Sequence, residues 1–328
     1  MTEKAVVFSS IHEIQHRASF RDNQEISPEN FQSLVGRYRF DEEVICQVKT
    51  AKGFCHQKHK VGWVGKTNDG TEVLIGGHCA GIYFRADRRF VMETKRINKE
   101  IEHEKLKNKI TEYRSNVLVL NQKLKVMRDE LIEVRKKMST FYKSVPNVIL
   151  RFVYEAQKNQ NWDVIVDVLD RSVHRHQDEW IIHKLSTLKP ISPIENALGT
   201  IGQLKFVSEK YEELCKIDLN TLSTPKMKQY VDALSRIDEV EKESFRLKRE
   251  AKFFFESRNL DFFLYICDDY EEKFLTVRSI LAVTDAKVSS DAHINLRINR
   301  IVERVEKSLG GSQVRKNQIS LKYRHSQL

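Results

Sequence analysis

The chain has few of the residues that interrupt regular secondary structure. Of its 328 residues only 12 are glycine and 5 are proline. So few turn-forming residues argue against a sheet-rich protein with many tight turns, and the 31% of charged residues is typical of long polar helices. We therefore predict a mainly α fold. The length allows two or three domains.

Long apolar runs and a secretion signal are also missing. No segment reaches the roughly 18 apolar residues that a membrane-spanning helix needs. The N-terminal sequence MTEKAVVFSSIHEIQHR lacks the basic-then-apolar order of a signal peptide. The five cysteines are an odd number and form no disulfide framework. These absences predict a cytoplasmic protein with reduced thiols and no membrane partner.

Charge of one sign is in excess. The formal net charge is +10 and the pI is about 9.2. A basic chain of this kind favours an acidic partner, most often nucleic acid.

Strand signals are concentrated between residues 36 and 90, after an N-terminal segment at 1–35. The runs RYRFDEEVICQV, HKVGWVGKT and TEVLIG are short and rich in β-branched and aromatic residues. Asn68-Asp69-Gly70 separates the last two runs, which is a strong hairpin signal. We predict a small β-hairpin module over 36–90.

A helical pattern begins near residue 88. From Ile110 to Phe141 apolar residues recur at spacings of three and four, which predicts a coiled coil over 91–145 within one long helix. Val145-Pro146 ends this helix. The coil either folds back on the charged helix at 225–255 or pairs with a protein partner or a second copy, and its mixed seam does not decide between them.

The rest of the chain is predicted to be helical except at its end. Residues 146–190 are interpreted as short amphipathic helices and residues 191–311 as a helical C-terminal region. Residues 312–328 contain no acidic residue and are interpreted as a basic tail.

Candidate metal ligands cluster in the β-hairpin module. Three of the five cysteines and three of the eleven histidines lie between Cys46 and Cys79. A structural zinc site takes four such ligands in a tetrahedron. Cys55 and His59 form a close pair, and Cys79 opens the helical pattern, where a helix dipole stabilises a thiolate. The predicted ligands of a structural Zn²⁺ are Cys46, Cys55, His59 and Cys79, with His56 and His78 as alternatives.

The order of these elements resembles the treble-clef class of zinc modules. That order is a close ligand pair, a hairpin, and then a cysteine that opens a helix. The segment DGTEVLIGGHCA is similar to modules in which a strand ending in glycine brings a cysteine to the metal. The resemblance covers about residues 44–90, although the close pair is Cys55-x-x-x-His59 rather than Cys-x-x-Cys. It implies a metal that stabilises the module.

Basic residues surround the candidate ligands. No acidic residue occurs between Glu43 and Asp69. Lysines contact phosphates and aromatic residues stack on exposed bases, so this composition favours DNA or RNA. The predicted nucleic-acid-binding residues are Lys49, Lys52, Lys58, Lys60, Lys66, Arg85, Arg88 and Arg89.

These features favour a non-enzymatic, zinc-containing adaptor that binds nucleic acid, with the coiled coil setting spacing or assembly. The first alternative is a protein-interaction scaffold, a subunit of a larger complex. The second is a metal-dependent nuclease with His56 or His78 as base, although the helix that follows lacks the accompanying asparagine and histidine. The sequence contains no nucleophile elbow, dinucleotide fingerprint or kinase signature, and we expect no small-molecule substrate.

Overall fold

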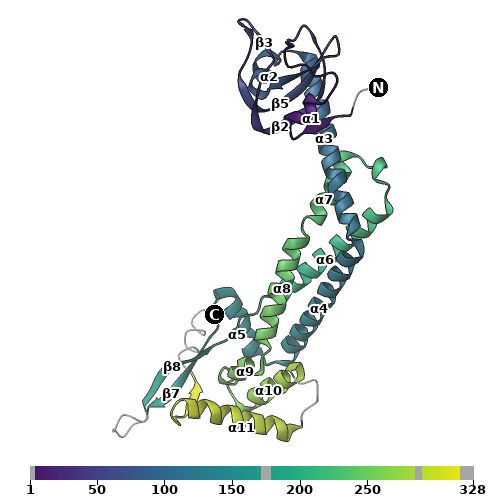
Figure 1. The fold of residues 1–328 in the computed structure, drawn as a ribbon. Helices are drawn as coiled ribbons and strands as arrows, with labels where there is room; N and C mark the ends of the chain where they lie inside the picture. Colours follow the sequence, from purple (N-terminus) through teal and green to yellow (C-terminus); the bar gives the residue numbers. More distant parts are fainter. Residues whose placement is uncertain (1–3, 171–178, 285–289, 318–328) are drawn as a thin grey trace. The chain divides into compact units, whose positions relative to one another are not determined.

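The computed structural model describes residues 4–170, 179–284 and 290–317, which form two compact units (Figure 1). The N-terminal unit contains residues 4–116 and 214–232. The C-terminal unit contains the described residues of 117–213 and those from 233 onward. None of the described helices combines the length and the apolar character needed to cross a membrane.

A four-stranded sheet forms the centre of the N-terminal unit (Figure 1). Its strand order is β1-β2-β5-β6, in which β1 runs parallel to β2 and the other neighbours are antiparallel. The strands are β1 (Val6–Phe8), β2 (Phe31–Ile45), β5 (Lys58–Thr67) and β6 (Glu72–Gly76). The turn between β5 and β6 contains Asn68-Asp69-Gly70, and Gly70 has φ +88°, so the predicted hairpin is confirmed.

Both faces of this sheet are covered. One face packs against Phe84, Phe90 and Ile97, which follow or belong to α2 (Gly77–Tyr83) and α3 (Arg88–Ser115). The other face packs against the apolar side of α1 (Ile11–Gln15), whose Ile11 and Ile14 share a core cluster with Phe8 of β1. Because both faces are buried, β6 is buried along its whole length. The prediction of a small β-hairpin module over 36–90 is therefore wrong.

The predicted uninterrupted coiled coil is also wrong. The helix ends at Ser115 and resumes as α4 (Val117–Ser144), and Asn116 between them has φ −103° and ψ 14°. Serine and asparagine are poor helix formers because their side chains compete for backbone hydrogen bonds. The two halves belong to different units. From Leu124 onward much of the predicted seam is buried, against α8 (Ile237–Phe254) and α10 (Tyr270–Thr284) of the same chain (Figure 1).

A second sheet overturns the mainly α prediction. The structure is mixed, with 59% helix and 20% strand. β7 (Asp163–Asp170) pairs with β8 (Glu179–Thr187) and with β9 (Val314–Lys316), both antiparallel. Short helices were predicted over 146–190, but among the described residues of that range α5 (Asn147–Asn159) alone is helical. The alternate residues Val164, Val166 and Val168 of β7 are buried in the core of the C-terminal unit, which is the period-two pattern of a strand.

Helices complete the two units. β9 lies in the segment predicted to be a basic tail, and residues 318–328 of that segment lie outside the described residues.

In the C-terminal unit Asp261 is buried and accepts hydrogen bonds from Arg297 at 2.9 Å and Arg304 at 2.8 Å, so its charge is paired. The remaining helical elements are α6 (Ile194–Lys216), η1 (Leu219–Thr221), α7 (Thr224–Leu234), α9 (Ser257–Leu260), η2 (Asp261–Tyr265) and α11 (Asp291–Ser308).

Candidate metal centre

Cys46 lies directly after β2, where it is held by two other segments. Its backbone N–H donates to the carbonyl oxygen of Gln57 at 2.9 Å. Its sulfur accepts a hydrogen bond from the N–H of Gly76, the last residue of β6, at 3.4 Å. The side chain is fully buried. Pairing of β2 with β5 and of β5 with β6 therefore fixes the position of this thiol.

Cys55 follows a hairpin of two-residue strands, β3 (Lys49–Thr50) and β4 (Gly53–Phe54). The turn requires Gly53 at φ +93°, a conformation that favours glycine. The N–H of Cys55 then donates to the carbonyl oxygen of Val48 at 3.0 Å. This tight hairpin returns the chain so that Cys55 lies close to Cys46.

Cys79 lies in the first turn of α2 and is buried. The sulfur atoms of Cys46, Cys55 and Cys79 all lie within 4.8 Å of one another, and we call these three residues the cysteine cluster. Three sulfurs bound to one tetrahedral zinc at about 2.3 Å would lie about 3.8 Å apart. The observed spacing thus suits a single metal ion, and the cysteine cluster could hold one.

Burial raises the pKa of the Cys46 thiol and of the Cys79 thiol. Near Cys79, hydrogen bonding with Cys55 and the negative charge of a neighbouring thiolate raise the pKa further. Three thiolates could not share this buried space without a cation. A bound metal would supply the positive charge that keeps the thiols deprotonated.

His59, the fourth predicted ligand, is not part of the cluster. Its Nδ1 donates to the carbonyl oxygen of Val44 at 2.7 Å, and its Nε2 then accepts from the hydroxyl of Tyr38 at 2.7 Å. Burial lowers the pKa of His59, which favours the neutral ring that this arrangement requires. Both ring nitrogens are thus occupied by protein groups.

The two alternative ligands do not join the cluster either. His56 is exposed, and its ring centroid lies 4.7 Å from that of Phe54. His78 is exposed on α2. Among the described residues, the group able to hold a metal consists of the three cysteines alone. Gln57, which no sequence signal singled out, places its side-chain oxygen 3.7 Å from the Cys79 sulfur.

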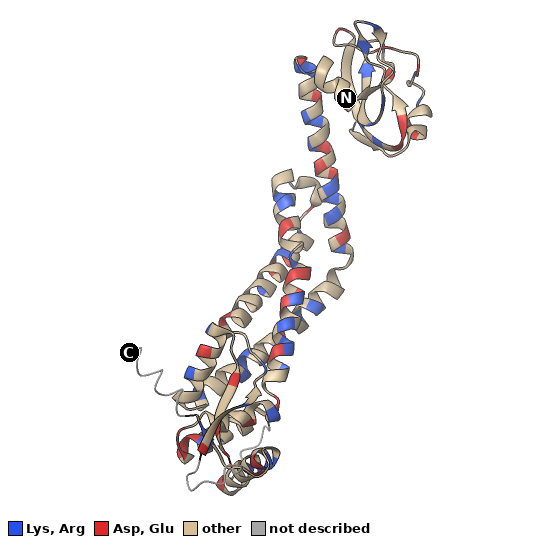
Figure 2. Cartoon of the chain, turned by 90° about the vertical axis from the view of Figure 1, so that its left-hand side faces the viewer, with Lys and Arg blue, Asp and Glu red and all other residues tan. Residues whose placement is uncertain are grey.

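The predicted nucleic-acid-binding residues differ in the exposure and in the contacts of their side chains. Exposed side chains belong to Lys49, Lys52, Lys58, Lys60, Arg85 and Arg88. Lys66 is half-buried on β5, and its charge helps to lower the pKa of Glu72. Arg89 is exposed as well, and its guanidinium donates to the carbonyl oxygen of Pro28 at 2.7 Å. Figure 2 marks lysine and arginine positions in blue along both units. Seven of the eight basic side chains are therefore exposed.

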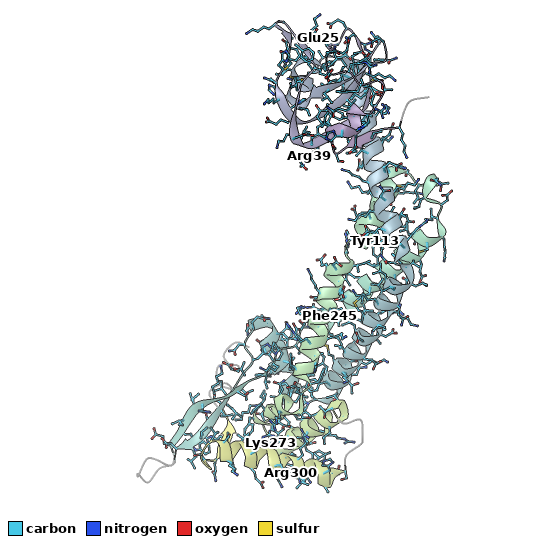
Figure 3. All side chains as sticks on the ribbon, in the orientation of Figure 1. Glu25, Arg39, Tyr113, Phe245, Lys273 and Arg300 are labelled. Atoms are coloured by element: carbon cyan, nitrogen blue, oxygen red, sulfur yellow. The ribbon has the colours of Figure 1, made fainter. Side chains whose placement is uncertain are left out.

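Two further basic residues were not predicted. Arg37 and Arg39 are exposed on β2, and Arg39 lies at the edge of the N-terminal unit (Figure 3). The guanidinium of Arg37 lies 5.6 Å from the centre of the Trp63 ring on β5. The alternation in Arg37-Tyr38-Arg39-Phe40 was the available signal, because alternate residues of a strand share a face.

The three cysteines could hold a soft metal ion, and exposed basic side chains belong to neighbouring segments. Thiolate ligands select zinc, copper(I) or iron–sulfur clusters over hard ions such as Mg²⁺. The supply of three protein ligands leaves one tetrahedral position for a side chain that moves or for a molecule from solution. The chain matches no protein-family model, no curated protein and no solved structure, so these comparisons assign it to no family.

Proposed function

We propose that the N-terminal unit is a zinc-containing module that binds nucleic acid without catalysing a reaction on it. The cysteine cluster would hold the metal, which would fix the loop after β2, the β3–β4 hairpin and the start of α2 to one another. Zinc suits this role because it binds thiolates tightly and has no redox chemistry. The protein would thus act as an adaptor that brings nucleic acid to other partners.

The observation that carries the nucleic-acid proposal is the placement of lysines on the segments that hold the cluster. Lys49 and Lys52 belong to the β3–β4 hairpin, and Lys58 and Lys60 belong to the start of β5. All four side chains are exposed. Exposed lysines without nearby acidic residues in sequence contact phosphates through charge, with little dependence on base sequence.

The zinc part is tested by elemental analysis of purified protein. We expect one zinc per chain, lost in each of the variants Cys46→Ala, Cys55→Ala and Cys79→Ala. Cys215→Ala, which changes an exposed cysteine outside the cluster, is the matched control and should keep its zinc. A well-folded wild-type protein without metal would contradict the zinc assignment.

The nucleic-acid part is tested by fluorescence polarisation with labelled oligonucleotides over a range of salt concentrations. The variant with Lys49, Lys52, Lys58 and Lys60 all changed to glutamine should bind more weakly. The slope of log K against log salt should fall by about 3 with single strands, since each phosphate contact contributes roughly 0.7. The control changes four exposed lysines of α4 and α6, namely Lys125, Lys136, Lys137 and Lys205. Absence of binding even at low salt would favour the protein-interaction scaffold instead.

A further inference from the structure

A cleft of about 510 Å³ lies beside the cysteine cluster in the N-terminal unit. We call it the aromatic cleft, because its lining includes Phe20, Phe54 and His56 together with Asp22, Asn23 and Gln47. Its volume falls within the range of sites that enclose small organic groups, about 300–1,000 Å³. A few polar side chains on a largely apolar lining are also typical of such sites.

The walls of the aromatic cleft are the sequence neighbours of two cluster cysteines. Ile45 and Gln47, on either side of Cys46, both line it. Phe54 and His56, on either side of Cys55, line it too. A metal on the two cysteines would therefore also fix the two walls relative to each other. Metal binding would therefore stabilise the shape of the cleft.

The wall of the cleft that contains Phe54 and His56 has a strained backbone, and its imidazole has no hydrogen-bond partner among the described residues. His56 has φ +54°, in the left-handed region that residues other than glycine seldom adopt. Such strain concentrates at binding and catalytic sites. The Phe54 and His56 rings lie 4.7 Å apart at an interplanar angle of 33°, and the imidazole has no hydrogen bond to any described residue. These rings can offer a stacking surface to a planar ligand.

Asp22 and Asn23 form a polar rim of the cleft, and the buried side chain of Gln47 holds their segment in place. The Gln47 amide donates to the carbonyl oxygens of Arg21 at 2.7 Å and Gln24 at 3.0 Å, and its oxygen accepts from the N–H of Leu74 at 2.7 Å. These bonds hold the intervening residues Asp22 and Asn23 at the cleft. Neither of those two side chains forms a hydrogen bond or ion pair with the described residues, so both are available to a ligand.

Lysines flank the cleft through strand register. Lys49 pairs with Phe54 across the β3–β4 hairpin, and Lys58 pairs with Ile45 between β5 and β2. Each exposed lysine therefore lies on a strand next to a residue of the lining. A nucleotide within a strand has a planar base and is flanked by anionic phosphates. It therefore suits an aromatic pocket with cations beside it.

We propose that the aromatic cleft binds one unstacked nucleobase, so that the preferred ligand is single-stranded nucleic acid. This inference rests on the proposed nucleic-acid binding. The base would stack on Phe54 and His56, and Lys49 and Lys58 would contact the adjoining phosphates. A base inside a duplex is stacked and paired and cannot enter.

The rim also specifies which bases bind best. The Asp22 carboxylate accepts hydrogen bonds but donates none, so it fits the exocyclic amino group of cytosine, adenine or guanine. Thymine and uracil have no such group. A cytosine strand should bind more tightly than a thymine strand of the same length, by about fivefold, the ratio expected for one net hydrogen bond.

The test uses the full zinc-loaded chain with labelled oligo(dC), oligo(dT) and a duplex of equal length. We expect single strands to bind more tightly than the duplex at every salt concentration. Phe54→Ala should weaken single-strand binding roughly tenfold and leave the salt slope unchanged, because stacking involves no phosphate. The matched control is Tyr83→Ala, an exposed aromatic residue of α2 that does not line the cleft.

A second variant keeps the test independent of folding. Asp22→Asn changes an exposed side chain that has no hydrogen bond to the described residues, and it should abolish the preference for oligo(dC) over oligo(dT) while binding persists. Equal affinity for single strands and duplex, unaffected by either variant, would overturn the base-binding cleft but leave the proposed nucleic-acid binding intact. Failure of the wild-type chain to bind any of the oligonucleotides at low salt would overturn both.

Discussion

The sulfur atoms of Cys55 and Cys79 lie 3.3 Å apart, although 24 residues separate them in sequence. Cys55 is half-buried, whereas Cys79 and Cys46 are buried. Oxidants from solution therefore reach Cys55 first. The Cys79 sulfur lies beside that of Cys55, so we expect the metal-free cluster to be sensitive to oxidation.

We predict that hydrogen peroxide forms a Cys55–Cys79 disulfide in metal-free protein. The two thiols lose two electrons and two protons, and the peroxide is reduced to two molecules of water. Zinc should slow this reaction at least tenfold, because both sulfurs are then bound to the metal. Peptide mass mapping after a timed exposure measures the product, and Cys55→Ser is the control. A disulfide that forms at the same rate with and without zinc would contradict a shared metal site.

A second prediction concerns the contact between Gly76 and His59. A Cβ atom at Gly76 would lie 2.2 Å from Cδ2 of His59. The imidazole cannot move aside easily, since both its nitrogens are hydrogen bonded at 2.7 Å. Gly76→Ala should therefore destabilise the protein by about 1–3 kcal/mol, the usual cost of overpacking. Urea unfolding measures this loss.

Gly81 provides the matched control for that substitution. It lies on α2, and a Cβ atom there would have no neighbour within 4 Å. Gly81→Ala should be neutral or stabilise the protein by up to about 1 kcal/mol, because alanine has the higher helix propensity. Equal effects of the two alanines would show that the His59 ring is not held where the structure places it.

The sequence predicts local features of the candidate site better than it predicts the long-range ones. The β5–β6 hairpin follows from Asn68-Asp69-Gly70, whose turn preference is local. The grouping of three cysteines follows from their spacing around that hairpin. The position of His59 does not, because it depends on the pairing of Val44 with His59 between β2 and β5. That pairing brings the ring to Tyr38 instead of to the cysteines.

The same distinction explains the errors in the fold. The apolar spacing from Leu124 to Phe141 predicts a buried helix face, and the structure buries much of that face. The spacing does not reveal the break at Asn116. It also does not decide that two helices of the same chain, rather than a second copy, bury this face. β7 was misread because Val164, Ile165 and Val168 also fit a helical spacing. It is a strand because β8 and β9 pair with it, and β9 is more than a hundred residues away in sequence.

A third prediction concerns the ion pair between Arg17 and Glu72. Burial of the Glu72 carboxyl would raise its pKa, but hydrogen bonds from Arg17 at 2.6 and 2.9 Å, a hydrogen bond from Ser19 and the charges of Arg17 and Lys66 together hold the pKa below its usual range. The stabilisation is therefore complete above the unfolded-state pKa, near 4.5, and is lost as the pH falls through the lower folded-state value.

Arg17→Ala should destabilise the protein by about 1–3 kcal/mol at pH 7, since it leaves a buried carboxylate without its main partner. The difference from wild type should shrink as the pH falls below about 4.5, where Glu72 becomes protonated. Urea unfolding at pH 7 and pH 4 tests this sign. Arg39→Ala, which removes an exposed arginine of the same unit, should show little effect at either pH. A difference that grows on acidification would refute the assigned role of Glu72.

The fourth prediction tests the packing of α4 within its own chain, using two leucines of that helix. Leu131 is fully buried, whereas Leu118 is 83% exposed. Leu131→Ala should destabilise the protein by about 2–5 kcal/mol, because it removes buried methyl groups and leaves a cavity beside the helices that cover it. Leu118→Ala should change stability by less than about 0.5 kcal/mol. Both are measured by urea unfolding at several protein concentrations. If burial of Leu131 is intramolecular, its unfolding midpoint will not depend on protein concentration, whereas a midpoint that rises with concentration would mean that a second copy covers this face.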